Sequence, residues 1–190
     1  MGRLKKKQDV YVPDPIKVLA VDPSLRSTGL AVITYDRKKD VEDPKAYQIT
    51  SCQVLVNPAK FTGTDAIMNM LDMITEEAKK TCYSECKANV IESPGAMFNK
   101  AWGAGTVCAI SHISGGSIII FGLQKSYIFR PNEWNRNRNK SITHANTIDF
   151  IGSPDTWDYE NPLKHEKYFE HVLDAASMGI WWIKNTQKHG

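Results

Sequence analysis

The apolar positions along the chain follow two different periods, which together predict a mixed α/β fold. Short apolar runs bounded by turn residues predict strands at residues 17–22, 30–35, 47–56, 88–92 and 125–129. Apolar residues at helical spacing predict helices at residues 64–80, 99–114, 140–151 and 163–184. Thr64 is the expected N-cap of the first helix, and Gly115-Gly116 is the expected end of the second. The order βββαβαβαα predicts a sheet of about five strands flanked by helices, while Ile118–Phe121 fits either a helix or a strand.

Length and composition predict a single domain. The chain has 190 residues, of which 42% are hydrophobic and 24% charged, enough for a self-supporting core. This composition excludes disordered, collagenous and coiled-coil proteins. Residues 1–16 are basic, contain Pro13 and Pro15, and are expected to form a flexible arm before a domain at residues 17–190.

No membrane segment or secretory signal is expected. The longest strongly apolar run, Ser117–Leu123, is far shorter than the ~20 residues of a membrane span. The basic N-terminus has no apolar segment behind it. The four cysteines are too few and too scattered for a disulfide framework, and Cys82 and Cys86 have no second pair at zinc spacing. Thiols in a reducing cytoplasm are therefore expected.

The formal net charge of +3 says little about partners, but the basic residues are unevenly placed. Between residues 125 and 140 one acid, Glu133, stands among basic residues, four asparagines and three aromatic residues. This mixture suits phosphate contacts and base stacking, although a solvated loop explains it equally well. The candidate DNA-binding residues of this segment are Lys125, Arg130, Arg136, Arg138 and Lys140.

Three acidic residues stand where chemistry is possible. Asp22 and Glu92 each end a predicted strand, and strand ends in α/β sheets lie beside ligand crevices. Asp174 lies on the last predicted helix, three residues after His171 and therefore on the same helical face. Three converging acids would repel one another unless a positive charge compensates them. A pair of divalent cations such as Mg²⁺ or Mn²⁺ provides that charge and supports phosphodiester cleavage.

Each of these residues also has a purely structural interpretation. Asp22 precedes Pro23 and suits a turn, Glu92 suits a loop, and His171 suits a packed or exposed helix position. Asp174 is harder to explain in this way, because it interrupts an apolar stretch and needs a partner or a metal.

Three blocks of the sequence resemble the RuvC family of Holliday-junction resolvases, and a phage-type member in particular. Residues 18–33 resemble the first motif, in which an apolar strand ends in Asp-Pro and Thr-Gly precedes the return strand. Residues 90–99 resemble the second motif, a strand that ends in the catalytic Glu and is followed by an aromatic-bearing loop. Residues 171–177 resemble the last motif, a helix carrying His or an acid and, three residues later, Asp.

The resemblance implies an RNase H-like fold, a homodimer and Mg²⁺-dependent symmetric nicking of four-way DNA junctions. Asp22, Glu92 and Asp174 would be catalytic, metal-binding carboxylates that hold two Mg²⁺ ions, with Mn²⁺ as a substitute. His171 would be the fourth catalytic and metal-site residue, either as a ligand or by steering water and the scissile phosphate.

The sequence departs from the family pattern in a few places. Ser24 replaces the Gly that often follows Asp-Pro. Lys140 matches the second of two family lysines, whereas the first falls near Asn135. Phe98 fits either the base-contacting aromatic residue of the family or the core. The small residues of the helix at 99–114 suit either a dimer contact or packing within the chain.

These observations predict an enzyme, a crossover junction endodeoxyribonuclease that works in the cytoplasm, or in the host cytoplasm if phage-encoded. Its expected partners are branched DNA and a second copy of the chain, with no membrane. One alternative is a catalytically inactive RNase H-like module that binds DNA structure, and another is a broader branched-DNA or flap nuclease. A nucleotide-binding ATPase is excluded by length, because 190 residues leave no room for a second half.

Overall fold

A five-stranded mixed sheet forms the centre of the computed structural model, which describes residues 14–94, 103–135, 139–157 and 169–187. The strands are β1 (Ile16–Asp22), β2 (Ser27–Tyr35), β3 (Tyr47–Val56), β4 (Ala88–Glu92) and β5 (Ser126–Phe129). Their spatial order is β3-β2-β1-β4-β5. β1, β2 and β3 pair antiparallel, whereas β1, β4 and β5 pair parallel.

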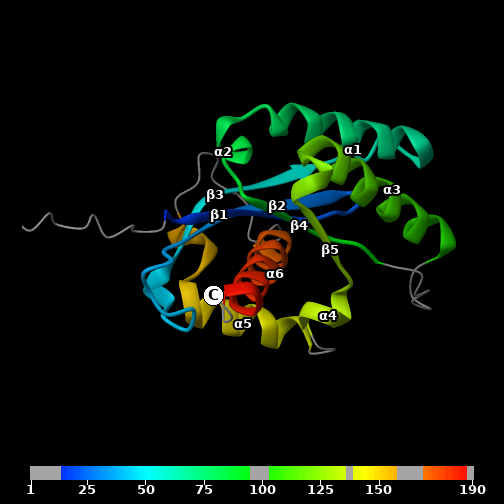
Figure 1. Ribbon diagram of the computed structural model, residues 1–190. Helices are drawn as coiled ribbons and strands as arrows, with labels where there is room; N and C mark the ends of the chain where they lie inside the picture. The colour runs from blue at the N-terminus through cyan, green and yellow to red at the C-terminus, as the bar shows by residue number, and fades with distance from the viewer. Residues whose placement is uncertain (1–13, 95–102, 136–138, 158–168, 188–190) are drawn as a thin grey trace, which may run out of the picture.

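Helices cover both faces of the sheet (Figure 1). One face carries α1 (Gly63–Ala78), the short α2 (Thr81–Ser84) and α3 (Ala104–Phe121). The other face carries α6 (Phe169–Gln187), with α5 (Lys140–Ile151) and the short α4 (Pro131–Asn135) packed against α6. Three 3₁₀ turns complete the described elements: η1 (Pro44–Ala46), η2 (Leu123–Lys125) and η3 (Pro154–Thr156).

The central strand β1 divides two hydrophobic cores. Because side chains alternate along a strand, Val18 and Ala20 face α6, whereas Leu19 and Val21 face α1 and α3. All four side chains are fully buried. A strand buried on both faces reads as a continuous apolar run, which explains the pattern seen in the sequence.

The five predicted strands and their order along the chain are confirmed, as are the bounds of α5, although β2 starts at Ser27 and not at residue 30. Several helix boundaries are wrong: α1 ends at Ala78 and not at residue 80, and α6 ends at Gln187 and not at residue 184. The N-cap of α1 is Thr62, not Thr64. α3 does not end at Gly115-Gly116 but continues to Phe121, so Ile118–Phe121 is helical. Gly116 lies in the contact with α1, where an added Cβ would lie 2.3 Å from a methyl carbon of Leu71. The close packing of two helices therefore outweighs the low helix propensity of glycine.

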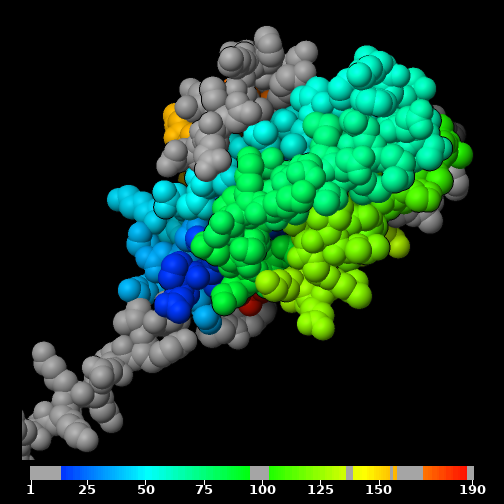
Figure 2. Space-filling model, turned by 90° about the horizontal axis from the view of Figure 1, so that it is seen from above, coloured from blue at the N-terminus to red at the C-terminus, as the bar shows by residue number. Residues whose placement is uncertain are grey.

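The whole of α3 is apolar, not only the short run at residues 117–123. Within the described residues it is the one helix whose length and mean hydropathy (1.6 over 18 residues) would suffice for a membrane span, and 33% of it is buried. Ser114 and Ser117 are buried in the packing, whereas Ala104, Gly105 and Ser111 are exposed. Some small residues of α3 therefore pack within the chain, whereas others lie on the solvent-exposed face of the helix. Figure 2 shows α1 and α3 side by side on this surface of the molecule.

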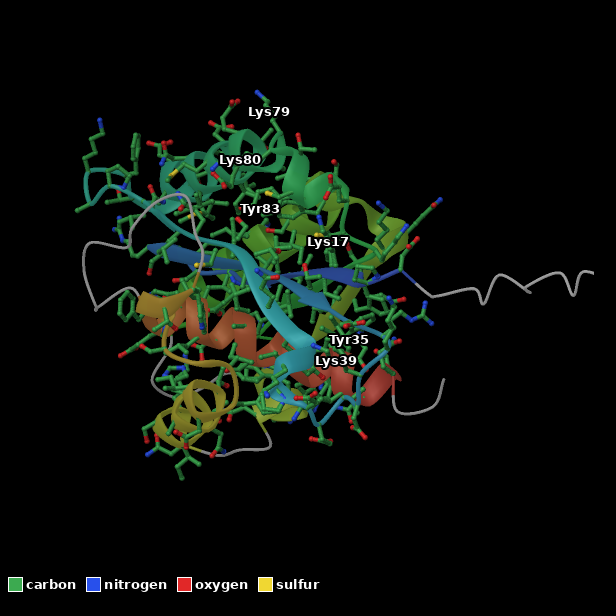
Figure 3. All side chains as sticks on the ribbon, turned by 90° about the vertical axis from the view of Figure 1, so that its left-hand side faces the viewer. Lys17, Tyr35, Lys39, Lys79, Lys80 and Tyr83 are labelled. Carbon is green, nitrogen blue, oxygen red and sulfur yellow. The ribbon has the colours of Figure 1, made fainter. Side chains whose placement is uncertain are left out.

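Polar side chains tie the outer elements to the sheet. Tyr83, which follows α1, donates a hydrogen bond of 2.8 Å to Glu77 beneath the helix, while Lys79 stays at the surface (Figure 3). On the other side, the Tyr35 hydroxyl donates to the carbonyl of Lys39 over 2.8 Å. None of the four cysteines forms a disulfide. The predicted arm at residues 1–16 lies almost entirely outside the described residues.

Candidate active site

Strand alternation places Asp22 and Glu92 on the α6 face of the sheet. Asp22 follows Ala20 by two residues, and Glu92 follows Val90 by two residues, so both carboxylates share the face of those core residues. β1 and β4 are parallel neighbours, with Val21 opposite Ile91 at their ends. The next residue of each strand is an acid, so the two carboxylates meet at the same end of the sheet.

The turn after Asp22 is closed by Thr28. Its hydroxyl donates to the carbonyl of Ser24 over 3.1 Å and accepts from the Ser24 amide over 3.2 Å. Ser24, at the position where the family often has Gly, thus fits the turn through its backbone.

α6 approaches β2 closely enough to add the third carboxylate. Gly29 lies opposite Asp22 in the sheet, and a Cβ at Gly29 would lie 2.2 Å from the backbone oxygen of His171. The first turns of α6 therefore rest directly on the backbone of β2. This contact carries His171 and Asp174 over the ends of β1 and β4.

Asp174 is 2% exposed and has two partners on α5. Its Oδ2 accepts from the Lys140 ammonium at 2.5 Å, and its Oδ1 lies 2.9 Å from His144 Nε2. Burial acts to raise the pKa of Asp174, but hydrogen bonds and charge from His144 and Lys140 outweigh it and lower the pKa. The need for a partner, predicted from the sequence, is met here by α5.

Glu92 is the carboxyl that holds a proton in this cluster. Its burial, followed by the charge of Asp22, a hydrogen bond to Asp22 and the charge of Asp174, raises the pKa of Glu92 to about 10. For Lys140, burial acts to lower the pKa, and the ion pair with Asp174 together with the charges of Asp22 and Glu92 raises it. These shifts show that the three acids converge and share one ammonium.

His171 joins the cluster from the N-terminal part of α6. Its Nδ1 lies 3.3 Å from Asp22 Oδ2, and its Nε2 lies 2.5 Å from the hydroxyl of Ser27 at the start of β2. The ring is therefore held on both sides, by one residue from each of the two central antiparallel strands.

The donor set fits divalent cations in its chemistry. Three carboxylates and one imidazole provide the hard oxygen ligands and the nitrogen that Mg²⁺ or Mn²⁺ accept. Within the described residues, no group of three or more His, Cys, Asp or Glu side chains is already arranged to hold a metal ion. The contacts above agree with this: Asp174 is turned to Lys140 and His144, and Glu92 is hydrogen-bonded to Asp22. A cation bound here would take the place of the ammonium.

The candidate DNA-binding residues are not all brought to this cluster. Lys140 is in it, and Arg130 follows β5 at the end of the sheet that carries Glu92. Lys125 precedes β5 at the opposite end, where its ammonium lies 3.4 Å from the carbonyl of Cys86. Phe129 comes four positions after Lys125, which places Lys125 roughly 13 Å from the cluster end of the sheet. Phe98, Arg136 and Arg138 lie outside the described residues.

Two residues of the site were not predicted. His144 could have been inferred from its position, since it lies one helical turn after Lys140 on the predicted helix. Ser27 carried no signal in the sequence, because its contact with His171 joins residues 144 positions apart.

Comparisons with solved structures identify the fold, whereas comparisons of sequence find no match. No protein-family model matches the sequence, and no curated protein sequence matches it. RuvC of Thermus thermophilus superposes with a TM-score of 0.64, and with 0.60 when in complex with a Holliday junction substrate. These matches cover 92% and 90% of this chain and 97% of RuvC, at 11% identity.

Two further solved structures have the same fold. The yeast mitochondrial Holliday junction resolvase Ydc2 matches with a TM-score of 0.57 and 11% identity over 95% of this chain and 84% of Ydc2. The Fowlpox virus resolvase, in complex with Holliday junction DNA, matches with a TM-score of 0.53 and 13% identity over 90% of this chain and 98% of that resolvase. The strand order, the helices on both faces and these superpositions together show that the chain has the RNase H-like fold of the Holliday junction resolvases.

Proposed function

We propose that this protein is a metal-dependent endonuclease that resolves four-way DNA junctions by paired symmetric nicks. The observation that carries the proposal is the convergence of Asp22, Glu92 and Asp174 at one end of the sheet, in the fold of solved junction resolvases. Burial, followed by the charges of Asp22 and Asp174, raises the pKa of Glu92, so added positive charge would stabilise the ionised cluster. A crossover junction endodeoxyribonuclease requires such a place.

The proposed cofactor is a pair of Mg²⁺ ions, with Mn²⁺ as a substitute, held by Asp22, Glu92, Asp174 and His171. When bound, such cations activate water and stabilise the leaving oxygen of a phosphodiester. For these cations to bind, Glu92 would have to release its proton to solvent and Lys140 would have to move off the Oδ2 of Asp174. The hydrogen bond from His144 to Oδ1 would hold Asp174 in place while Oδ2 becomes available.

Lys140 is well placed to contact the substrate after this exchange. Its side chain is 62% exposed although its ammonium lies on the buried Asp174. A lysine released at the edge of the carboxylates can bind a DNA phosphate. Arg130 extends the positive charge at the same end of the sheet, and Phe98, Arg136 and Arg138 remain proposed DNA contacts.

Paired nicks need two active sites, so we propose that a homodimer acts on each junction. Three exposed apolar side chains, called the apolar patch below, support this proposal. They are Ile119 (79% exposed) near the end of α3, Leu123 (74%) in the η2 turn and Ile128 (53%) on the edge strand β5. Exposed apolar side chains on neighbouring elements are typical of an interface. A second copy of the chain is the occupant we propose for this patch.

The proposal is tested by incubating labelled four-way, forked and linear duplex DNA with the protein, with and without Mg²⁺, and mapping the nicks. We expect symmetric nicks in the four-way junction only when Mg²⁺ is present. Nicking of forks and flaps at the same rate would instead indicate a broader branched-DNA nuclease. Tight binding of junctions without cutting in Mg²⁺ or Mn²⁺ would identify an inactive DNA-structure-binding module.

The variant that tests the role of Asp174 is Asp174→Asn, which keeps the shape of the side chain and removes its charge. Junction binding should survive and nicking should fall by at least ~100-fold, because the variant loses a metal-binding carboxylate. Retained nicking would remove Asp174 from the mechanism.

A further inference from the structure

Ser27 holds the imidazole of His171 from the side opposite to the carboxylates. It is the first residue of β2 and is 9% exposed, and its Oγ lies 2.5 Å from His171 Nε2. The other ring nitrogen, Nδ1, lies 3.3 Å from Asp22 Oδ2. Each nitrogen of the ring therefore has one defined neighbour, and the neighbours come from two strands of the sheet.

The backbone of β2 fixes this arrangement. Ser27, Gly29 and Ala31 alternate onto the face that α6 covers, as the burial of Ala31 against α6 indicates. Gly29 leaves room for the backbone of His171, and a Cβ there would lie 3.0 Å from the Cβ of His171. The close approach at Gly29 brings the ring of His171 to the hydroxyl two residues earlier.

The chemistry of the three groups sets the direction of the hydrogen bonds. An ionised carboxylate only accepts, so the Nδ1 of His171 donates to Asp22. The Nε2 of a neutral ring is then an acceptor, and the Ser27 hydroxyl donates to it. A hydroxyl can also accept, so Ser27 can hold the ring equally well when the proton is on Nε2 and Nδ1 is free for a cation.

We infer that Ser27 is a positioning residue that orients His171 and presents its Nδ1 to the carboxylate cluster in both forms of the ring. This inference rests on the proposed function, since it assigns a role at the same metal site. Ligating histidines nearly always make a hydrogen bond through the nitrogen that faces away from the metal, and loss of that bond typically costs ~10–100-fold in metal affinity or activity.

The same three residue types form the triad of serine hydrolases, but the burial of Ser27 argues against that role. A nucleophilic serine must be open to its substrate. Ser27 keeps 9% of its surface exposed and lies beneath the start of α6. Its hydroxyl serves the histidine and not a substrate.

The test compares Ser27→Thr with Ser27→Val in the full chain. Threonine and valine have the same shape, so any strain from the additional methyl group is common to both variants and the hydroxyl is the one difference. Thermal melting of both variants shows whether each one folds. The comparison is valid even if both are less stable than the unmodified protein.

The first readout uses metal-free protein with ¹⁵N-labelled histidine, in which the ring signals of His171 are identified by their loss in His171→Asn. We expect the unmodified protein and Ser27→Thr to carry the proton on Nδ1 in one defined tautomer. Ser27→Val should keep the proton on Nδ1, where Asp22 still accepts it, but its Nε2 signal should move to that of a ring nitrogen without a hydrogen bond. Identical ring signals in the Thr and Val variants would overturn the inference.

The second readout is Mn²⁺ affinity by calorimetry, with junction nicking at a series of Mn²⁺ concentrations. We expect Ser27→Val to bind Mn²⁺ ~10–100-fold more weakly than Ser27→Thr and to regain nicking at high Mn²⁺. Equal affinities would contradict the positioning role. If the unmodified protein bound no Mn²⁺ and cut no junction, the proposed function would fail, while the ring signals would still decide whether Ser27 orients His171.

Discussion

The ionisation of Glu92 opposes the fold. Burial and the neighbouring charges of Asp22 and Asp174 raise the pKa of Glu92 to about 10. The folded protein therefore holds a proton that the unfolded chain releases once the pH passes the ordinary range of a glutamate. A proton bound in the folded state and absent from the unfolded state makes stability fall as pH rises.

We therefore expect the thermal midpoint of metal-free protein to fall as the pH is raised from about 5 to about 9. Glu92→Gln should flatten this slope, because glutamine fills the same space and does not ionise. The measurement is a series of melting curves in a chelating buffer. Equal slopes in both proteins would show that Glu92 ionises freely in the fold.

The Lys140 ammonium occupies the position on Asp174 that a proposed metal ion would take. Removal of Lys140 should therefore have opposite effects on the binding of metal and of DNA. Lys140→Met keeps the length of the side chain and removes the charge that competes with a metal. Mn²⁺ should bind several-fold more tightly, while junction affinity should fall and its salt dependence should weaken by about one phosphate contact.

Calorimetry and filter binding at several salt concentrations would measure both effects. Lys184→Met is a matched control, because the Lys184 ammonium lies 2.8 Å from Glu42, away from the carboxylates. Equal changes in the two variants would indicate a general loss of positive charge.

The acids of the candidate site could be predicted from the sequence because each one breaks or ends an apolar pattern. Asp22 and Glu92 end apolar strands, and Asp174 interrupts an apolar helix face. Their partners could not be predicted so directly. The hydrogen bond between Ser27 and His171 depends on how α6 packs on β2. The contact between His144 and Asp174 depends on how α5 packs on α6. Both are properties of the tertiary structure.

Among the elements, the contact between β2 and α6 is the one on which the site depends. Gly29→Ala would place a Cβ 2.2 Å from the backbone oxygen of His171, and backbone cannot move aside as a side-chain end can. We expect a loss of about 1–3 kcal/mol in the free energy of unfolding, as for other overpacked sites. Metal affinity should also fall, because His171 and Asp174 both move with α6.

Gly115→Ala is the matched control for this prediction. Nothing lies within 4 Å of a Cβ at Gly115, which is in the interior of α3. The substitution should stabilise the protein by about 0.5–1 kcal/mol through helix propensity. Denaturant unfolding of both variants separates the two effects. A neutral result for Gly29→Ala would mean that α6 can shift on β2 without loss.

The strands were easier to predict than the helices. A central strand buried on both faces leaves an apolar run with clear ends, whereas α3 continues through two glycines that normally mark a helix end. The low propensity of these glycines is offset by the packing of α3 on α1, and this packing is visible only in three dimensions. The helices α2 and α4, of four and five residues, are too short to give a period.

At the scale of the whole molecule, the apolar patch on α3, η2 and β5 predicts association. Ile119→Glu should convert a dimer into a monomer, because a charge in the centre of an apolar interface is costly. Met68→Glu on α1 is the control, since Met68 is also exposed (53%) but lies outside the patch. Sedimentation velocity would measure the change, and junction nicking should lose its paired character. A monomeric unmodified protein would rule out the patch as an interface.

The position of Asp174 late in the chain has a consequence for synthesis in the cell. The first acid lies on the first strand, and the last acid lies on a helix that begins at residue 169. A ribosome-bound chain that ends before this helix has a sheet but no complete set of acids. On the proposed function, the emerging chain would therefore be unable to cut nearby nucleic acid until the third carboxylate has been synthesised, and the same would hold for fragments that stop earlier.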